Sequence, residues 1–204
     1  MKVLIACEYS GIVRDAFTKK GHDAWSCDIL DTESPGNHIQ DDILKHLDKN
    51  WDLMIAHPPC THLAVSGARW FTEGKKDWSL QEEALDFVRK LLDAPIEKIA
   101  LENPVSVIST KIRKPNQIIQ PFQFGHDVSK KTCLWLKNLP NLTPTKIVKP
   151  DIIEKNGYKM SRHHWETFKL PSKIRGKVRS RFYEGIADAM ADQWGSNETI
   201  KLLS

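Results

Sequence analysis

A cysteine directly after two prolines, and a glutamate some forty residues later, are the residues best placed to do chemistry. Cys60 follows Pro58-Pro59, just after the apolar run 52–56, and Glu102 follows the next apolar run. Prolines fix the backbone and withhold N–H groups, so we expect the thiol to sit in a rigid turn. Alone, such a cysteine is usually a core residue and such a glutamate a turn residue. The interpretation therefore rests on the pair.

Together the two side chains suit chemistry at a pyrimidine ring. A thiolate can add to carbon 6 of cytosine, and a carboxyl group can bind or protonate ring nitrogen 3 to assist that addition. Carbon 5 of the resulting enamine can then attack an electrophilic methyl group. Cys60 and Glu102 supply the two functional groups that this reaction requires at minimum, a thiolate and a carboxyl group.

Short continuous apolar runs predict the strands that would position these groups. Such runs are typical of buried parallel strands, and a helical pattern that ends before Gly21 follows the first of them. The runs cover residues 3–6, 24–27, 52–56 and 99–101, and the helix covers 12–19. This alternation of strands and helices predicts an α/β fold with a mostly parallel sheet.

A second helix is predicted to begin at a capping box, in which Ser79 is the cap and Glu82 follows three residues later. It should run to about residue 93. The residues expected on its inner face are Leu80, Ala84, Phe87, Val88 and Leu91.

The C-terminal half shows weaker patterns. Residues 132–136 are predicted to form a strand, and 186–194 a helix with an apolar face. Residues 138–150 contain several Pro and Asn, and 151–177 are polar and basic, which indicates a long loop or a small subdomain.

Each predicted strand is followed by polar or reactive groups. They are Glu8, Ser10 and Gly11 after the first strand, Asp28 after the second, Cys60 after the third and Glu102 after the fourth. In open α/β sheets ligands bind outside the carboxyl ends of the strands, so these groups should converge on one cleft.

Composition limits the class of protein. The 204 residues, 40% hydrophobic and 27% charged, suit one globular domain. The first apolar run is too short for a signal peptide and no run is long enough to span a bilayer, so we expect a cytoplasmic protein. The four cysteines form no C-x-x-C pair, which predicts free thiols and disfavours a zinc site.

The charge is unevenly distributed along the chain. Residues 111–181 contain 17 basic and 4 acidic residues, a balance of +13, whereas the remainder has 13 basic and 22 acidic residues, a balance of −9. A basic block suits a polyanionic partner such as nucleic acid, and a merely well-solvated surface is the alternative.

Residues 2–104 and 185–195 resemble the carbon-5 cytosine-specific DNA methyltransferases. Pro58-Pro59-Cys60 is similar to the family's Pro-Pro-Cys motif, and Glu102-Asn103-Pro104 is similar to its Glu-Asn-Val motif. The resemblance implies a single-domain, Rossmann-like class I methyltransferase fold with a mostly parallel sheet and helices on both faces. It makes Cys60 the nucleophile and Glu102 the residue that grips and protonates the base.

The resemblance also implies S-adenosyl-L-methionine as cofactor. The family's Phe-x-Gly-x-Gly turn is replaced here by a segment with a single glycine, Gly11. Backbone approach to the cofactor near Gly11 still fits, because glycine has no side chain. The expected cofactor-binding residues are Glu8, Ser10, Gly11, Asp28 at the ribose, Asp42 near the adenine, and Pro58.

A base in a duplex must be flipped out to react, and the resemblance places further residues around it. The segment 61–78 corresponds to a loop that closes over the base. Lys130 and Lys131 occupy the place of an Arg-rich motif, and Lys131 is assigned a loose catalytic role. The residues expected to contact substrate or DNA are Arg69, Trp70, Asn103, Lys130, Arg179 and Arg181.

The predicted organisation is a catalytic core, residues 1–136 and 182–204, with a short basic insertion, 137–181, as a reduced DNA-recognition region. So short a region predicts limited sequence specificity, or a protein partner that supplies it. Compact enzymes of this kind are similar to those of phages and mobile elements. Neither a metal nor a membrane is expected as a partner.

Other functions remain open. Amino-methyltransferases carry an Asp/Asn-Pro-Pro-aromatic motif, and His57 and Cys60 argue against them. A carbon-5 cytosine methyltransferase acting on tRNA would use the same residues. A third alternative is a nucleic-acid-binding or regulatory protein that has the fold but no catalytic activity. A fourth is an enzyme that transfers a group other than methyl by the same intermediate.

Overall fold

The computed structural model describes residues 1–155 and 157–196, which contain a seven-stranded sheet in the order β3-β2-β1-β4-β5-β7-β6. β1 to β5 are parallel to one another, whereas β7 is antiparallel to both of its neighbours, β5 and β6. The strands are β1 (Lys2–Ala6), β2 (Asp23–Asp28), β3 (His38–Gln40), β4 (Leu53–Ala56), β5 (Lys98–Pro104), β6 (Gln117–Ile119) and β7 (Thr132–Lys137).

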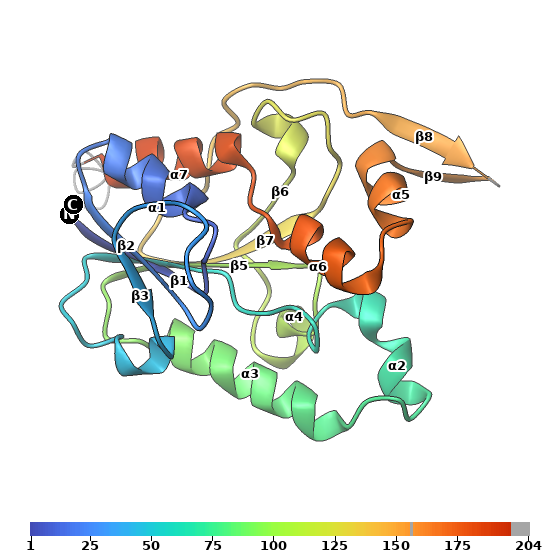
Figure 1. Cartoon of the computed structure of the whole chain (residues 1–204), viewed down its shortest axis with the longest axis horizontal. Coiled ribbons are helices and arrows are strands. Elements are labelled where there is room, and N and C mark those ends of the chain that lie inside the picture. Colours follow the sequence, from blue (N-terminus) through green and yellow to red (C-terminus); the bar gives the residue numbers. More distant parts are fainter. Residues whose placement is uncertain (156, 197–204) are drawn as a thin grey trace.

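Helices cover both faces of this sheet. α1 (Ile12–Lys19) and α7 (Glu184–Gly195) pack on one face, and α3 (Trp78–Leu92) and α4 (Ile108–Lys111) pack on the other (Figure 1). Alternate side chains of each strand serve the two layers: Val3 and Ile5 join the first core, and Leu4 and Ala6 join the second. This is the Rossmann-like architecture expected from the sequence, and the fold-class prediction is confirmed.

The start of α3 differs from its prediction. Asp77, not Ser79, is the N-cap, and its side chain accepts a hydrogen bond from the Ser79 N–H. The prediction of a capping box at Ser79 is therefore wrong, because the helix already begins at Trp78. Leu80 is 37% exposed, whereas the amide of Gln81 is buried and donates to the carbonyl of His62.

Residues 151–177 are not a long loop. They form a hairpin, β8 (Ile152–Lys155) and β9 (Tyr158–Ser161), followed by α5 (Arg162–Phe168) and the start of α6 (Ser172–Ser180). The alternative of a small subdomain describes them correctly. The three-residue strands β3 and β6 also escaped prediction, because elements so short carry no periodic pattern.

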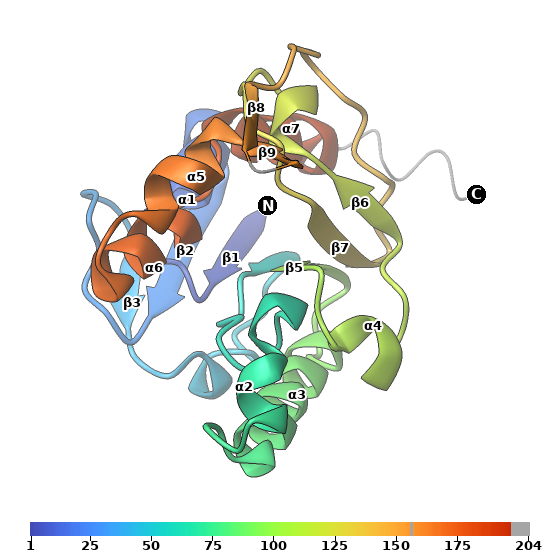
Figure 2. The same cartoon turned by 90° about the vertical axis from the view of Figure 1, so that its right-hand side faces the viewer.

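The carboxyl ends of the central strands lie toward the right of Figure 1, where α6 and α2 (Arg69–Thr72) lie on either side of them. Figure 2 views the molecule from that side, with the hairpin and α5 next to α6. No helix in the described residues is both long and apolar enough to cross a membrane.

Candidate active site at the carboxyl edge of the sheet

The predicted chemical groups lie at the carboxyl ends of four strands that are neighbours in the sheet. Asp28 is the last residue of β2, and Glu102, which was expected after the fourth strand, lies within the last three residues of β5. β2, β1, β4 and β5 lie side by side in that order, and the backbone N–H of His57 donates to the carbonyl of Ala6 at 2.9 Å, extending the ladder to the strand ends. Strands lie about 4.8 Å apart, so three steps separate Asp28 from Glu102 by on the order of 15 Å. The structure thus brings these groups to one edge.

The turn that carries Cys60 is anchored from the next strand. The side-chain amide of Asn103, 1% exposed, donates to the carbonyl of the buried Pro58 at 2.9 Å. After the turn, the N–H groups of Leu63 and Ala64 both donate to the carbonyl of Cys60. The cysteine is therefore held in a fixed turn at the protein surface, as its two prolines predicted. The Asn103 amide nitrogen, expected to contact substrate, here supports the turn.

Three charged side chains act on the Cys60 thiol. Burial by the surrounding protein raises its pKa, and the Glu102 carboxylate raises it further. The ammonium groups of Lys130 and Lys76 act in the opposite direction. Lys76 was not predicted from sequence, since it lies sixteen residues after the cysteine in a segment without a motif. Cys60 thus lies in the field of one carboxylate and two cations.

Lys130 and Lys131 occupy different surroundings. Lys130 is half-buried, and its Nζ donates to the carbonyl of Arg179 at 2.9 Å. Lys131 is exposed, and its charge lowers the pKa of Cys133. The charge of Lys130, by contrast, lowers the pKa of Cys60. Of the two lysines, Lys130 is therefore the better placed to influence the predicted nucleophile.

Glu102 has a side-chain partner that the sequence did not reveal. Its Oε2 lies 3.2 Å from Nδ1 of His57, the residue before the two prolines. The two side chains are 15% and 12% exposed. The imidazole also packs against Phe182, with ring centroids 4.7 Å apart.

Arg179 and Arg181, both expected to contact DNA phosphate, differ in their hydrogen bonds and exposure. Nε of Arg179 donates to Thr167 Oγ1 at 2.8 Å, and Nη2 donates to the His164 carbonyl at 3.0 Å. Arg179 therefore ties α6 to α5, and burial lowers its pKa. Arg181, by contrast, is exposed.

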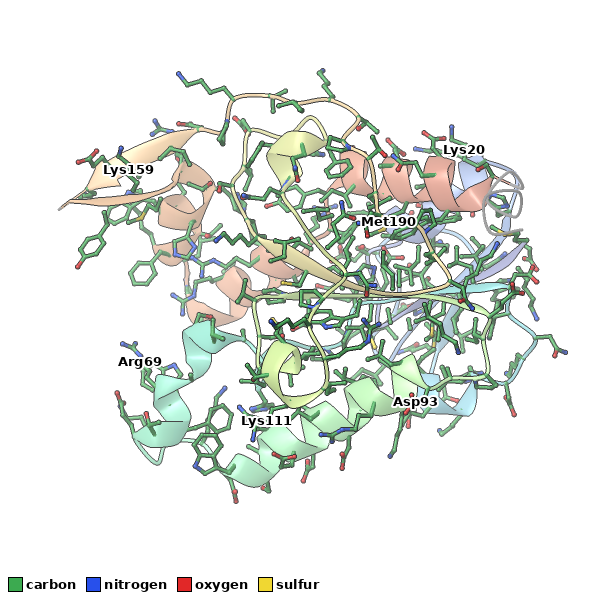
Figure 3. The ribbon with its side chains drawn as sticks, turned by 180° about the vertical axis from the view of Figure 1, so that it is seen from behind. Lys20, Arg69, Asp93, Lys111, Lys159 and Met190 are labelled. Atoms are coloured by element: carbon green, nitrogen blue, oxygen red, sulfur yellow. The ribbon has the colours of Figure 1, made fainter. Side chains whose placement is uncertain are left out.

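Residues 61–78 fold into ordered turns around α2. The Trp70 ring has two cations near it: the guanidinium of Arg69 lies 4.3 Å from its centroid, and Nζ of Lys75 lies 4.7 Å from it. Lys76 Nζ donates to the Thr61 carbonyl at 2.6 Å, which holds the segment near the cysteine turn. Figure 3 shows Arg69 and Lys159 of β9 at the same end of the molecule. Cationic side chains thus come to this end from both α2 and the hairpin.

Glu8 serves the first helix. Its side chain is buried, Oε1 accepts from the Val13 N–H at 2.8 Å, and Oε2 accepts from the Arg14 N–H at 3.2 Å. Ser10 Oγ donates to the same carboxylate. A carboxylate at a helix N-terminus satisfies unpaired N–H groups and complements the helix dipole. Both residues were expected to bind cofactor, and here their polar atoms stabilise the start of α1.

The single glycine of the first turn is required by a buried arginine. Gly11 has a φ of 77°, and a Cβ there would lie 2.4 Å from Nη2 of Arg14. Arg14 is 1% exposed and donates to the carbonyls of Ser34 and Pro35 and to the hydroxyl of Thr32. The turn therefore organises the loop after β2, beside the predicted cofactor site.

The groups at the ends of β2 and β3 fit S-adenosylmethionine. One oxygen of each carboxylate, Asp28 and Asp42, accepts a backbone N–H, and the other has no hydrogen-bond partner among the described residues. Burial and these nearby carboxylates raise the pKa of Cys27 to about 11. Asp28 pairs with Gln40, the last residue of β3, and Asp42 follows two residues later, so both acids lie at the same strand ends. Ile29 and Leu30, 74% and 52% exposed, add an apolar surface next to Asp28. Acids for sugar hydroxyls and an apolar surface for a base are what an adenosyl group needs.

No group of three or more potential ligand residues that could hold a metal ion occurs in residues 1–155 and 157–196.

Comparison with known proteins adds little beyond the fold. No protein-family model and no curated protein matches the sequence. One similar solved structure is an E. coli prophage-encoded protein, provisionally described as a DNA modification methyltransferase, with 17% identity and a TM-score of 0.45. The match covers 76% of this chain and 56% of that one, little more than half its length. Similarity at this level carries no argument about activity, which rests on the site itself.

Proposed function

We propose that this protein transfers a methyl group from S-adenosylmethionine to carbon 5 of cytosine in DNA. The observation that carries the proposal is the Cys60 turn, held by Asn103 beside Glu102 and under the charges of Lys130 and Lys76. The acids Asp28 and Asp42 lie along the same edge and suit the cofactor.

The side chains would act in a balanced sequence. The Cys60 thiolate forms a bond to carbon 6 while Glu102 gives a proton to ring nitrogen 3, leaving a neutral enamine. Bound S-adenosylmethionine would supply an electrophilic methyl group to carbon 5 and would leave as S-adenosylhomocysteine. Loss of the carbon 5 proton to a base then expels the Cys60 thiolate, and nitrogen 3 returns its proton to Glu102.

Glu102 would also control when Cys60 becomes reactive. As a carboxylate it raises the pKa of the thiol, together with burial. A Glu102 that carries a proton for the base has lost this negative charge, so the two lysines then act on the thiol unopposed by it. A protonated Glu102 would therefore favour the Cys60 thiolate.

The basic segment 137–181 favours nucleic acid as the substrate. Within the proposed recognition region, 137–181, the exposed cations include Lys155, Lys159, Lys169 and Arg181. Cations at one end of a protein release counterions from a phosphate backbone and so supply affinity without reading sequence. We propose that sequence reading is short or is completed by a protein partner.

The test is incubation of the purified protein with labelled S-adenosylmethionine and unmodified DNA, beside a tRNA control. Cys60→Ala should abolish transfer to carbon 5, whereas Cys133→Ala, which removes a buried thiol, should retain it. Transfer to tRNA alone would keep the chemistry and replace the substrate. Absence of transfer to either, combined with absence of cofactor binding, would refute the proposal and favour an idle nucleic-acid-binding protein.

A further inference from the structure

His57 is held on several sides next to the proposed acid. Its backbone N–H donates to the Ala6 carbonyl at 2.9 Å, and the proline that follows restricts its backbone to extended conformations. Phe182, from the segment between α6 and α7, covers the imidazole at a centroid distance of 4.7 Å. The ring therefore has little freedom to leave Glu102.

Glu102 is also the only polar side chain to which the imidazole bonds within residues 1–155 and 157–196. Nδ1 lies 3.2 Å from Glu102 Oε2, while Nε2 is buried and has no hydrogen-bond partner in that part of the chain. An ionised carboxylate only accepts, so a hydrogen bond to the Glu102 carboxylate requires the hydrogen to be on Nδ1.

We infer that His57 is a positioning residue that dictates which oxygen of Glu102 carries the proton. This inference rests on the proposed function. While Nδ1–H donates to Oε2, that oxygen is occupied as an acceptor, so a proton taken up by Glu102 goes to Oε1. A carboxyl group with a fixed donor oxygen is preorganised toward ring nitrogen 3, whereas an unanchored one must also find the right rotamer and the right oxygen.

Two substitutions separate the hydrogen bond from the space that the ring fills. His57→Phe keeps a ring against Phe182 but removes the donor, whereas His57→Asn places an amide N–H close to the position of Nδ1. His22→Phe is the matched control, since His22 is also partly buried against a phenylalanine, Phe17, but lies at the amino end of β2.

The variants are compared by kcat and KM for DNA and by thermal unfolding. His57→Phe should lower kcat about 10- to 100-fold, with KM for DNA changed less than about threefold. His57→Asn should recover most of the lost kcat, and His22→Phe should leave it unchanged. Wild-type kcat in His57→Phe, or an equal loss in His57→Asn and His57→Phe, would overturn the inference.

A second measurement does not depend on activity. Nitrogen-15 spectra of the labelled imidazoles, assigned with His57→Asn, should report an N–H at Nδ1 of His57 and a bare nitrogen at Nε2. The opposite tautomer would overturn the inference even in an active enzyme. An inactive wild-type protein with the expected spectrum would instead count against the proposed function and leave the hydrogen bond in place.

Discussion

Removal of the negative charge of Glu102 should make the Cys60 thiol more reactive at neutral pH, and removal of the positive charge of Lys130 should make it less reactive. Burial raises the pKa of this thiol first, the Glu102 carboxylate raises it next, and Lys130 lowers it. Glu102→Gln keeps the shape and the acceptor for His57 but loses the charge. Lys130→Met keeps most of the side-chain length without its ammonium.

The size of the effect follows from Coulomb's law. A unit charge about 5 Å from the sulfur, in an effective dielectric constant of about 50 for a partly exposed site, contributes about 1.3 kcal/mol. This is roughly a tenfold change in the thiolate fraction. A thiolate of lower pKa is also a weaker nucleophile, with a Brønsted coefficient of about 0.4–0.5, which leaves a net change in rate of about three- to fourfold.

The assay is the rate of alkylation by iodoacetamide at pH 7, followed by mass spectrometry of the peptide that contains Cys60. Lys131→Met is the matched control, because the charge of Lys131 acts on the buried Cys133. Equal rates for Glu102→Gln and the wild type would refute the electrostatic coupling. A slowing by Lys131→Met as large as that by Lys130→Met would refute the distinction between the two lysines.

Three further outcomes concern stability, measured as the free energy of unfolding in urea. Gly185→Ala should cost about 2 to 3 kcal/mol, because a Cβ there would lie 1.9 Å from a backbone carbonyl oxygen, whereas Gly176→Ala, with nothing within 4 Å, should be neutral or stabilise by up to about 1 kcal/mol. Equal losses would contradict the packing. Glu8→Ala should cost about 1 to 2 kcal/mol through the lost helix cap, and an unchanged stability would show that the cap is dispensable. Hydrogen bonds, foremost that from Lys45, hold the pKa of Asp41 well below its usual value, so its stabilisation is present above about pH 4 and is lost as the pH falls further. Asp41→Asn should therefore flatten the acid side of the stability profile, and a profile as steep as that of the wild type would contradict this.

Local patterns were sufficient for the central part of the fold. The helix predicted at 12–19 begins and ends as observed, and the four apolar runs lie within β1, β2, β4 and β5 or adjoin them by one residue. Continuous burial on both faces leaves such strands no polar positions, so the pattern is visible in any single segment. Segment 151–177 has no such pattern, and its hairpin and helices were missed.

The amino-acid sequence was sufficient to predict the fold class and the candidate pair, since parallel strands place the residues at their carboxyl ends along a common edge. It also placed Cys60 in a rigid turn, because proline restricts its own backbone wherever it lies. Which side chains meet at that edge was decided only by the tertiary structure. The contacts of Glu102 with His57 and of Asn103 with Pro58 join residues 45 apart in the chain, and they depend on strand register and rotamers. The same holds for Glu8, whose carboxylate caps the first helix because the chain folds back onto it within five residues. The hydrophobic pattern of a segment indicates which of its faces are buried. It does not indicate which neighbour a buried polar atom will bond to.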